Sequence, residues 1–65
     1  MLFSTYLLSF VNEKSEKGDL AREFFAGKSN AKTYLGVFKY FTAKNATYST
    51  LMLLKKIKKE YDKNV

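Results

Sequence analysis

Apolar residues recur at spacings of three and four along most of this 65-residue chain, which is the period of one face of a helix. The pattern predicts four helices, over residues 2–11, 19–26, 30–43 and 47–63. Polar residues fill 12–18, which we expect to form a loop. The chain has no proline and only three glycines, so the other connections should be short.

The expected helix ends carry residues that cap helices well. Asp19 follows Gly18, and its carboxylate should accept the free N–H groups in the first turn of the second helix. Gly27 should end that helix. For the other two helix starts, the candidate caps are Ser29 or Asn30 before the third helix and Asn45 or Thr47 before the fourth.

The apolar stripes of the four helices should meet in one core. A chain of this length buries only about 60% of its unfolded surface, and the absence of cysteine leaves no disulfide to compensate. The six Phe and five Tyr therefore have to supply much of the stability. The sequence predicts one all-α domain over residues 1–65, a small four-helix bundle. The residues expected in its core are Phe3, Leu7, Phe10, Leu20, Phe24, Tyr34, Val37, Phe38, Phe41, Leu51, Leu54, Ile57 and Tyr61.

Positive charge is concentrated in the second half of the chain. The net charge is +6, yet residues 1–27 are slightly acidic, whereas residues 28–65 hold nine lysines against only Glu60 and Asp62. Such asymmetry suggests a polyanionic partner, which could be nucleic acid, an anionic membrane surface or an acidic protein. The competing explanation is that the lysines serve solubility alone.

The last predicted helix carries the clearest basic pattern. Lys55, Lys59 and Lys63 stand four apart and should form one ridge, with Lys56 and Lys58 beside it. If the lysines upstream lie on the same side of the bundle, the ridge becomes part of a continuous positive surface. The candidate partner surface comprises Lys28, Lys32, Lys39, Lys44, Lys55, Lys56, Lys59, Lys63 and Tyr40.

Nucleic acid is the partner that this surface favours. Lysines that neutralise phosphates give salt-dependent binding without sequence preference. Arg22 is the single arginine, so direct reading of guanine is not expected. Tyr40 falls off the main apolar stripe, and we expect it to be exposed, where its ring could stack on a base.

A protein partner is the alternative. The acidic residues of the first half could meet the lysine ridge of a second copy, and such head-to-tail pairing builds rings or open polymers. A membrane partner is less favoured, because a basic amphipathic helix binds an anionic surface with the apolar face that this small core needs.

Catalysis is not expected. The chain has no histidine and no cysteine, so it lacks the commonest general base and the thiolate ligands of metal sites. No glycine-rich phosphate loop is present, and we expect neither a metal nor a cofactor. The apolar start of the chain lacks the preceding basic residues and the following cleavage site of a signal peptide, and a cytoplasmic location is expected.

Four short motifs resemble a known family. They are F-x-x-Y-L at residues 3–7, D-L-A-x-x-x-F at 19–25, the aromatic stretch 34–41 and N-A-x-Y at 45–48. This order is similar to that of the YozE family, small proteins of low-GC Gram-positive bacteria. The resemblance covers nearly the whole chain. It implies a fold like the sterile alpha motif (SAM-like), a group that includes nucleic-acid binders and modules that self-associate.

The chain departs from the family pattern in two places that bear on its surface. The family usually has a Phe-Pro element between the second and third helices, where this chain has residues 28–32 without proline. The last helix of the family tends to be acidic, and here it is basic. A diverged copy on a mobile genetic element would fit these departures.

Overall fold

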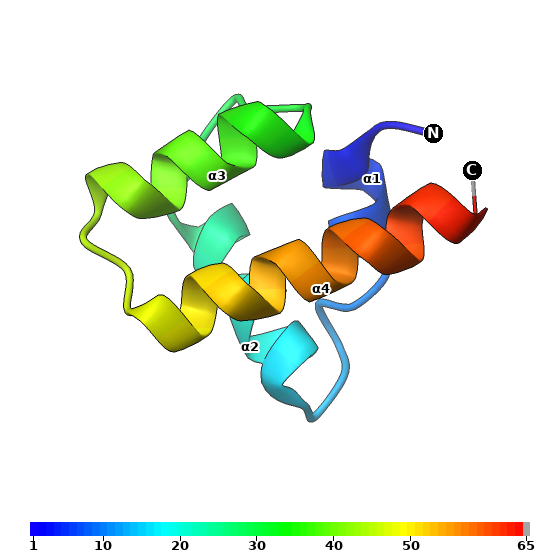
Figure 1. Cartoon of the computed structure of the whole chain (residues 1–65). Coiled ribbons are helices and arrows are strands. Elements are labelled where there is room, and N and C mark those ends of the chain that lie inside the picture. The colour runs from blue at the N-terminus through cyan, green and yellow to red at the C-terminus, as the bar shows by residue number, and fades with distance from the viewer. Residues whose placement is uncertain (65) are drawn as a thin grey trace.

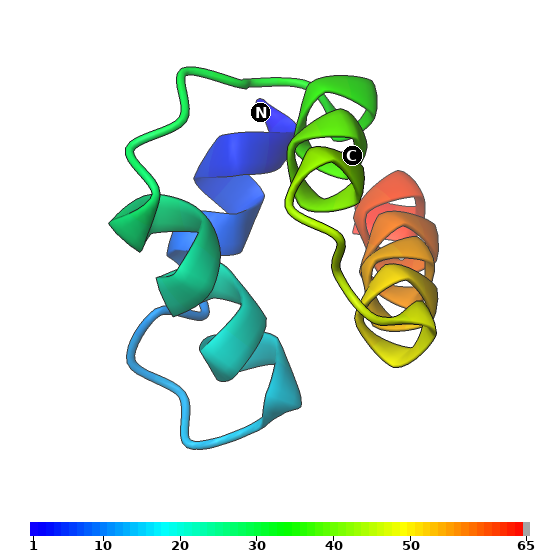
Figure 2. The same ribbon diagram turned by 90° about the vertical axis from the view of Figure 1, so that its left-hand side faces the viewer.

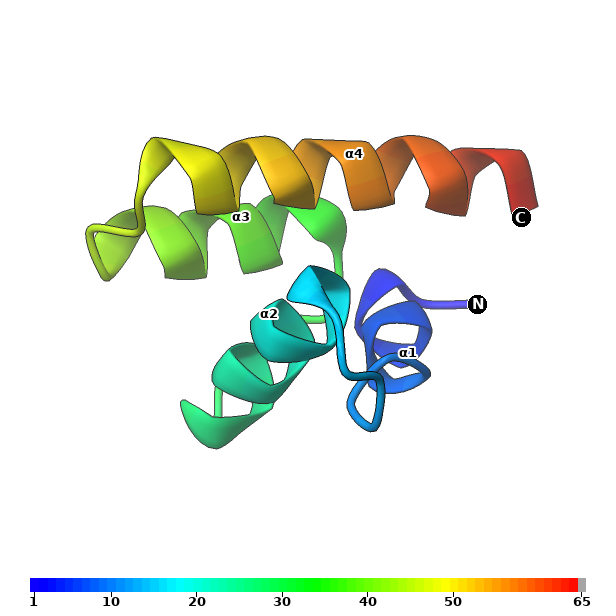
Figure 3. The same ribbon diagram turned by 90° about the horizontal axis from the view of Figure 1, so that it is seen from below.

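The chain folds as four helices packed in two layers. The computed structural model describes residues 1–64, and within that span it contains α1 (Phe3–Leu8), α2 (Glu16–Ala26), α3 (Tyr34–Ala43) and α4 (Tyr48–Asn64), with no strand. Helices α3 and α4 run side by side in opposite directions (Figure 1). Helices α1 and α2 lie on the other side of the core (Figures 2 and 3). The prediction of a small all-α four-helix bundle is confirmed.

One apolar cluster fills the space between the layers. Its buried members are Phe3, Leu7, Leu20, Phe24, Val37, Phe41, Leu54 and Ile57, all expected from the sequence. The other residues expected in the core lie at its edge, where they are partly buried and pack against it: Phe10, Tyr34, Phe38, Leu51 and Tyr61. Ala21 is fully buried as well.

The edge aromatics stay partly exposed because their polar tips and outer edges reach the surface. Phe3 in the core meets the rings of Tyr34 and Tyr61 edge-on, with centroids 5.4 and 5.2 Å away. The hydroxyl of Tyr61 donates a hydrogen bond to the backbone carbonyl of Met1. Amphipathic rings of this kind seal a small core while keeping their hydroxyls in polar surroundings.

The start of α2 differs from the prediction. Ser15 caps the helix, because its hydroxyl oxygen accepts the backbone N–H of Gly18 at 3.3 Å. Asp19 lies in the first turn instead of before it. The expected loop 12–18 was therefore wrong over its last three residues. Residues 16–18 fit the helix because Glu16 faces solvent, Lys17 pairs with Glu60 of α4, and Gly18 is buried where a side chain would not fit.

The start of α3 is also capped by a side-chain hydroxyl, but at a residue other than the two predicted ones. Helix α3 begins at Tyr34, capped by Thr33 and not by Ser29 or Asn30, because the Thr33 hydroxyl accepts the N–H of Gly36 at 3.3 Å. The Ser29 hydroxyl instead accepts the N–H of Ala31 within the preceding loop.

Helix α4 starts after Thr47, one of the two candidates, and the Thr47 hydroxyl accepts the N–H of Thr50 at 3.3 Å. Asn45, the other candidate, has φ of 59° in the turn that follows α3. At the end of α2, Gly27 keeps a right-handed φ of −77°, and Lys28 takes the left-handed conformation with φ of 55°. Helix α1 ends three residues earlier than predicted, at Leu8, and turns follow it.

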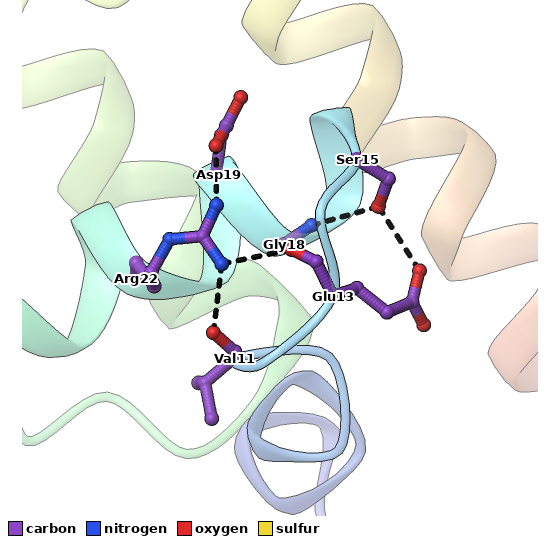
Figure 4. Close-up of polar contacts among 6 residues, drawn as sticks. All are labelled: Val11, Glu13, Ser15, Gly18, Asp19 and Arg22. Carbon is purple, nitrogen blue, oxygen red and sulfur yellow. Dashed lines mark hydrogen bonds and ion pairs between the residues drawn. The ribbon is translucent and has the colours of Figure 1, made fainter.

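Arg22 ties the loop between α1 and α2 to α2 (Figure 4). Its Nη1 donates to the backbone carbonyls of Val11 and Glu13, both at 2.8 Å, and its Nη2 pairs with the carboxylate of Asp19. Gly18 allows this approach, because a Cβ at that position would lie 1.9 Å from the carbonyl oxygen of Glu13. The single arginine of the chain therefore has a structural role.

Replacing Arg22 with methionine should lower the free energy of unfolding by about 1–2 kcal/mol, because two charged hydrogen bonds to the loop are lost at a partly solvated site. Thermal or urea denaturation followed by circular dichroism measures the change. The control is Asp19→Asn, which removes only an exposed ion pair and should cost less than about 1 kcal/mol. Equal losses in the two variants would contradict the assignment of the loop contacts as the main contribution.

Candidate functional site

Helix α4 has a buried side and a fully solvated side. Leu54 and Ile57 are completely buried against the other helices, so the residues on the opposite side of the helix must point to solvent. We call these residues the outer face of α4. It consists of Tyr48, Met52, Lys55, Lys56, Lys59 and Lys63, all of them exposed.

The two acidic residues of α4 each pair with a lysine that is not on the outer face. The carboxylate of Glu60 lies 2.6 Å from the Lys17 ammonium on α2, and the hydrogen bond between them raises the pKa of Lys17. Asp62 pairs with Lys58 one turn before it. Within residues 1–64, none of the four lysines on the outer face forms an ion pair. Their positive charge is therefore available to a partner.

Three of these lysines share one open depression on the surface. Lys55, Lys56 and Lys59 line it from the second half of the helix, and Tyr48 and Met52 line it from the first half. The remaining lining residues are Glu16, Ser49 and Leu53. The depression therefore combines three cations and one carboxylate, that of Glu16, with an exposed ring and a thioether.

The predicted lysines that precede α4 do not line this depression. Lys32 lines a different one, beside Lys58 and the exposed Leu35. Lys44 lies at the end of α3, where its ammonium is 5.0 Å from the centre of the Tyr40 ring. Lys28 is in the loop after α2 and Lys39 is on the exposed side of α3. Only the α4 lysines gather at the depression of Tyr48 and Met52.

Tyr40 is not the exposed aromatic that we expected. Its ring packs edge-on against Phe24 and Phe41, with centroids 5.4 and 5.3 Å away, and its hydroxyl oxygen is buried. Gly27 makes room for it, because a Cβ at that position would lie 1.4 Å from the Tyr40 hydroxyl oxygen. Tyr40 therefore joins α3 to the end of α2, and its ring face is not free for a base.

Tyr48 is the exposed aromatic that the sequence reasoning missed. Its side chain is 77% exposed at the first position of α4. The signal was present in the spacing, since Tyr48 lies seven and eleven residues before Lys55 and Lys59, in the same helical phase. In the sequence, Tyr48 stands out only as the last residue of the N-A-x-Y motif at 45–48.

An acidic depression adjoins the basic one. Glu16, Asp19 and Glu23 line it from α2, and Leu20, Ser49, Thr50 and Leu53 complete it. The two depressions share Glu16, Ser49 and Leu53. Acidic and basic side chains thus lie next to each other along the boundary between α2 and α4.

Residues 1–64 contain no group of three acidic, histidine or cysteine side chains close enough to bind a metal ion. In the same span, no helix has both the length and the apolar character needed to cross a bilayer.

No family model, curated protein or solved structure matches this chain.

The contact between Tyr40 and Gly27 can be tested by a mutant pair. Gly27→Ala should lower the free energy of unfolding by about 1–3 kcal/mol, because the new methyl group forces the Tyr40 ring out of its site. In a Tyr40→Leu background the ring is gone, so the same Gly27→Ala change should have little further effect. Chemical denaturation of the four proteins measures the coupling. Additive losses would show that the ring does not occupy this position.

Proposed function

We propose that this protein binds nucleic acid through the phosphate backbone and that the outer face of α4 is the contact surface. The supporting observation is the set of four exposed lysines on one helix side, none of which has an ion-pair partner in residues 1–64. A polyanion can approach this face without first displacing a carboxylate from the lysines.

The proposed binding is electrostatic and does not depend on base sequence. Each lysine that neutralises a phosphate releases a condensed counterion, so affinity falls steeply as salt rises. Arg22, whose guanidinium is the type best suited to reading guanine, already donates hydrogen bonds to the backbone carbonyls of Val11 and Glu13 in the loop before α2. The outer face therefore offers charge and apolar contact, and little that would distinguish one base edge from another.

We also propose that the protein is a non-enzymatic member of the YozE-like group with a SAM-like arrangement of helices. The support is that the apolar positions of the family-like motifs, among them Phe3, Leu7 and Leu20, lie in the core. A cytoplasmic location is part of this proposal, and the absence of cysteine fits a reducing compartment.

The salt dependence of binding tests the proposed function. Fluorescence anisotropy with a labelled oligonucleotide should give a log Kd that rises linearly with log salt concentration. A Lys56→Gln/Lys59→Gln variant should bind more weakly, and the slope should fall by about 1.5 because two phosphate contacts are lost.

The matched control removes the same charge elsewhere. Lys14 and Lys28 are exposed and line neither the depression of Tyr48 nor the acidic one, so Lys14→Gln/Lys28→Gln should leave the slope unchanged. Equal losses in the two double variants would mean that net charge alone governs binding. Binding that is insensitive to salt would contradict the proposed electrostatic binding to the phosphate backbone.

Self-association is a second candidate function, favoured by the adjoining acidic and basic depressions. When opposite charges lie next to each other on one surface, a two-fold axis between them places the acids of each copy on the lysines of the other. Leu53, shared by both depressions, would then lie near the centre of the contact. This geometry differs from the head-to-tail pairing suggested by the sequence, because both copies use the same surface.

Sedimentation velocity at several protein concentrations tests this candidate. A dimer should form as concentration rises at low salt and dissociate as salt is added. Glu23→Lys should weaken it because the variant places like charges opposite each other. Glu13→Lys, which changes charge outside the acidic depression, should have little effect. A strictly monomeric protein at millimolar concentration would eliminate self-association.

A further inference from the structure

We propose that the outer face of α4 binds single-stranded nucleic acid in preference to duplex, with the ring of Tyr48 stacking on a base while the lysines hold the adjacent phosphates. This inference rests on the proposed function and names its ligand class more closely. It comes from the place of Tyr48 in the same depression as Lys55, Lys56 and Lys59.

Tyr48 has the exposure and the support that a stacking residue needs. It is 77% exposed, whereas the other aromatic side chains of the chain are buried or partly buried against the core. Its backbone is fixed by the Thr47 cap, where the hydroxyls of Thr47 and Thr50 lie 3.1 Å apart and the N–H of Thr50 donates to Thr47. The ring therefore extends from the capped N-terminus of a helix and not from a loop.

The lysines follow the ring along the helix axis. Met52, 42% exposed, lies one turn after Tyr48 and offers a polarisable apolar surface between the ring and the cations. From Tyr48 to Lys59 the helix rises by roughly 16 Å, and Lys63 continues the row. A single nucleic-acid strand that runs along this face would place one base on the ring of Tyr48 and the next phosphates near the lysine ammonium groups.

A single strand fits this arrangement better than a duplex does. In a duplex the faces of the bases are covered by their neighbours, so an exposed ring beside the backbone gains nothing from stacking. In a single strand each base has a free face, and stacking on an aromatic ring adds affinity without sequence preference. If the ligand were a duplex, only the lysines would contribute to binding, and the exposed ring of Tyr48 would have no contact with a base.

The composition of the face also argues against a lipid surface. Helices that lie on anionic membranes insert a broad apolar side among the acyl chains. In α4 the aliphatic residues Leu54 and Ile57 are buried in the protein core. The outer face retains one ring and one thioether beside four lysines, which is too little apolar surface for insertion.

Fluorescence anisotropy with a labelled oligothymidylate of about 20 nucleotides, alone and annealed to oligodeoxyadenylate, tests the inference. The wild-type protein should bind the single strand more tightly than the duplex at equal salt. Tyr48→Ala should weaken single-strand binding by at least about fivefold, the loss expected for one stacked base, and leave duplex binding unchanged. Tyr48→Phe should retain most of the affinity, since the stacking face is kept.

Three controls separate the possible results. Tyr48→Ala should leave the salt slope unchanged, because no phosphate contact is lost. Leu35→Ala removes another exposed apolar side chain, one that lies outside the depression, and should have no effect. Circular dichroism should show that the fold of each variant is intact, as expected for side chains that lie outside the core.

The outcomes distinguish this inference from the proposed function. Equal affinity for the two probes, with no loss in Tyr48→Ala, would overturn the stacking inference and leave backbone binding standing. Equal losses for strand and duplex in Tyr48→Ala would also overturn it. No binding to either probe would overturn both proposals. Co-flotation with phosphatidylserine vesicles, without oligonucleotide binding, would replace them with a membrane function.

Discussion

The burial of Leu54 and Ile57 determines how α4 is oriented in the bundle. Both side chains are completely buried, and α4 contacts each of the other three helices. A short chain without disulfides depends on side chains of this kind to close its small core. The rotation of α4 about its own axis is therefore fixed, and the opposite side of the helix must face solvent. The lysine face is a direct result of how the core is filled.

The distribution of charge around α4 follows from the same orientation of the helix. Glu60 and Asp62 lie on the two flanks of α4, where Lys17 and Lys58 are within reach. Glu60 is thereby paired with α2 and Asp62 is paired within α4 itself, and the charged residues of the outer face are all lysines. Each exposed ion pair contributes little to stability. Its larger effect here is on the distribution of charge, because both carboxylates of α4 pair with lysines outside the outer face and leave the four outer lysines unpaired within residues 1–64.

The sequence predicted the helices and the core well, because apolar periodicity reports directly on which side of a helix is buried. It placed the start of α3 too early, since Ala31 and Lys32 suit a helix locally whereas Thr33 makes the actual cap. The start of α2 was placed too late because Asp19 was taken as the cap, whereas Ser15 is the actual cap. Tyr40 was assigned the wrong exposure and the exposure of Tyr48 was not predicted, because the space over Gly27 and the direction of α4 depend on contacts between helices. Helix spacing alone does not contain that information.

The central position of α4 links folding to the order of synthesis. This helix is the last of the four along the chain, and the core lacks Leu54 and Ile57 until it is made. The earlier helices cannot complete the bundle before it arrives. Its lysines, too, lie on one side only once the helix is formed and docked. Any ligand of the ordered face must therefore bind the native state in preference to the unfolded chain, and it will stabilise the whole bundle by mass action.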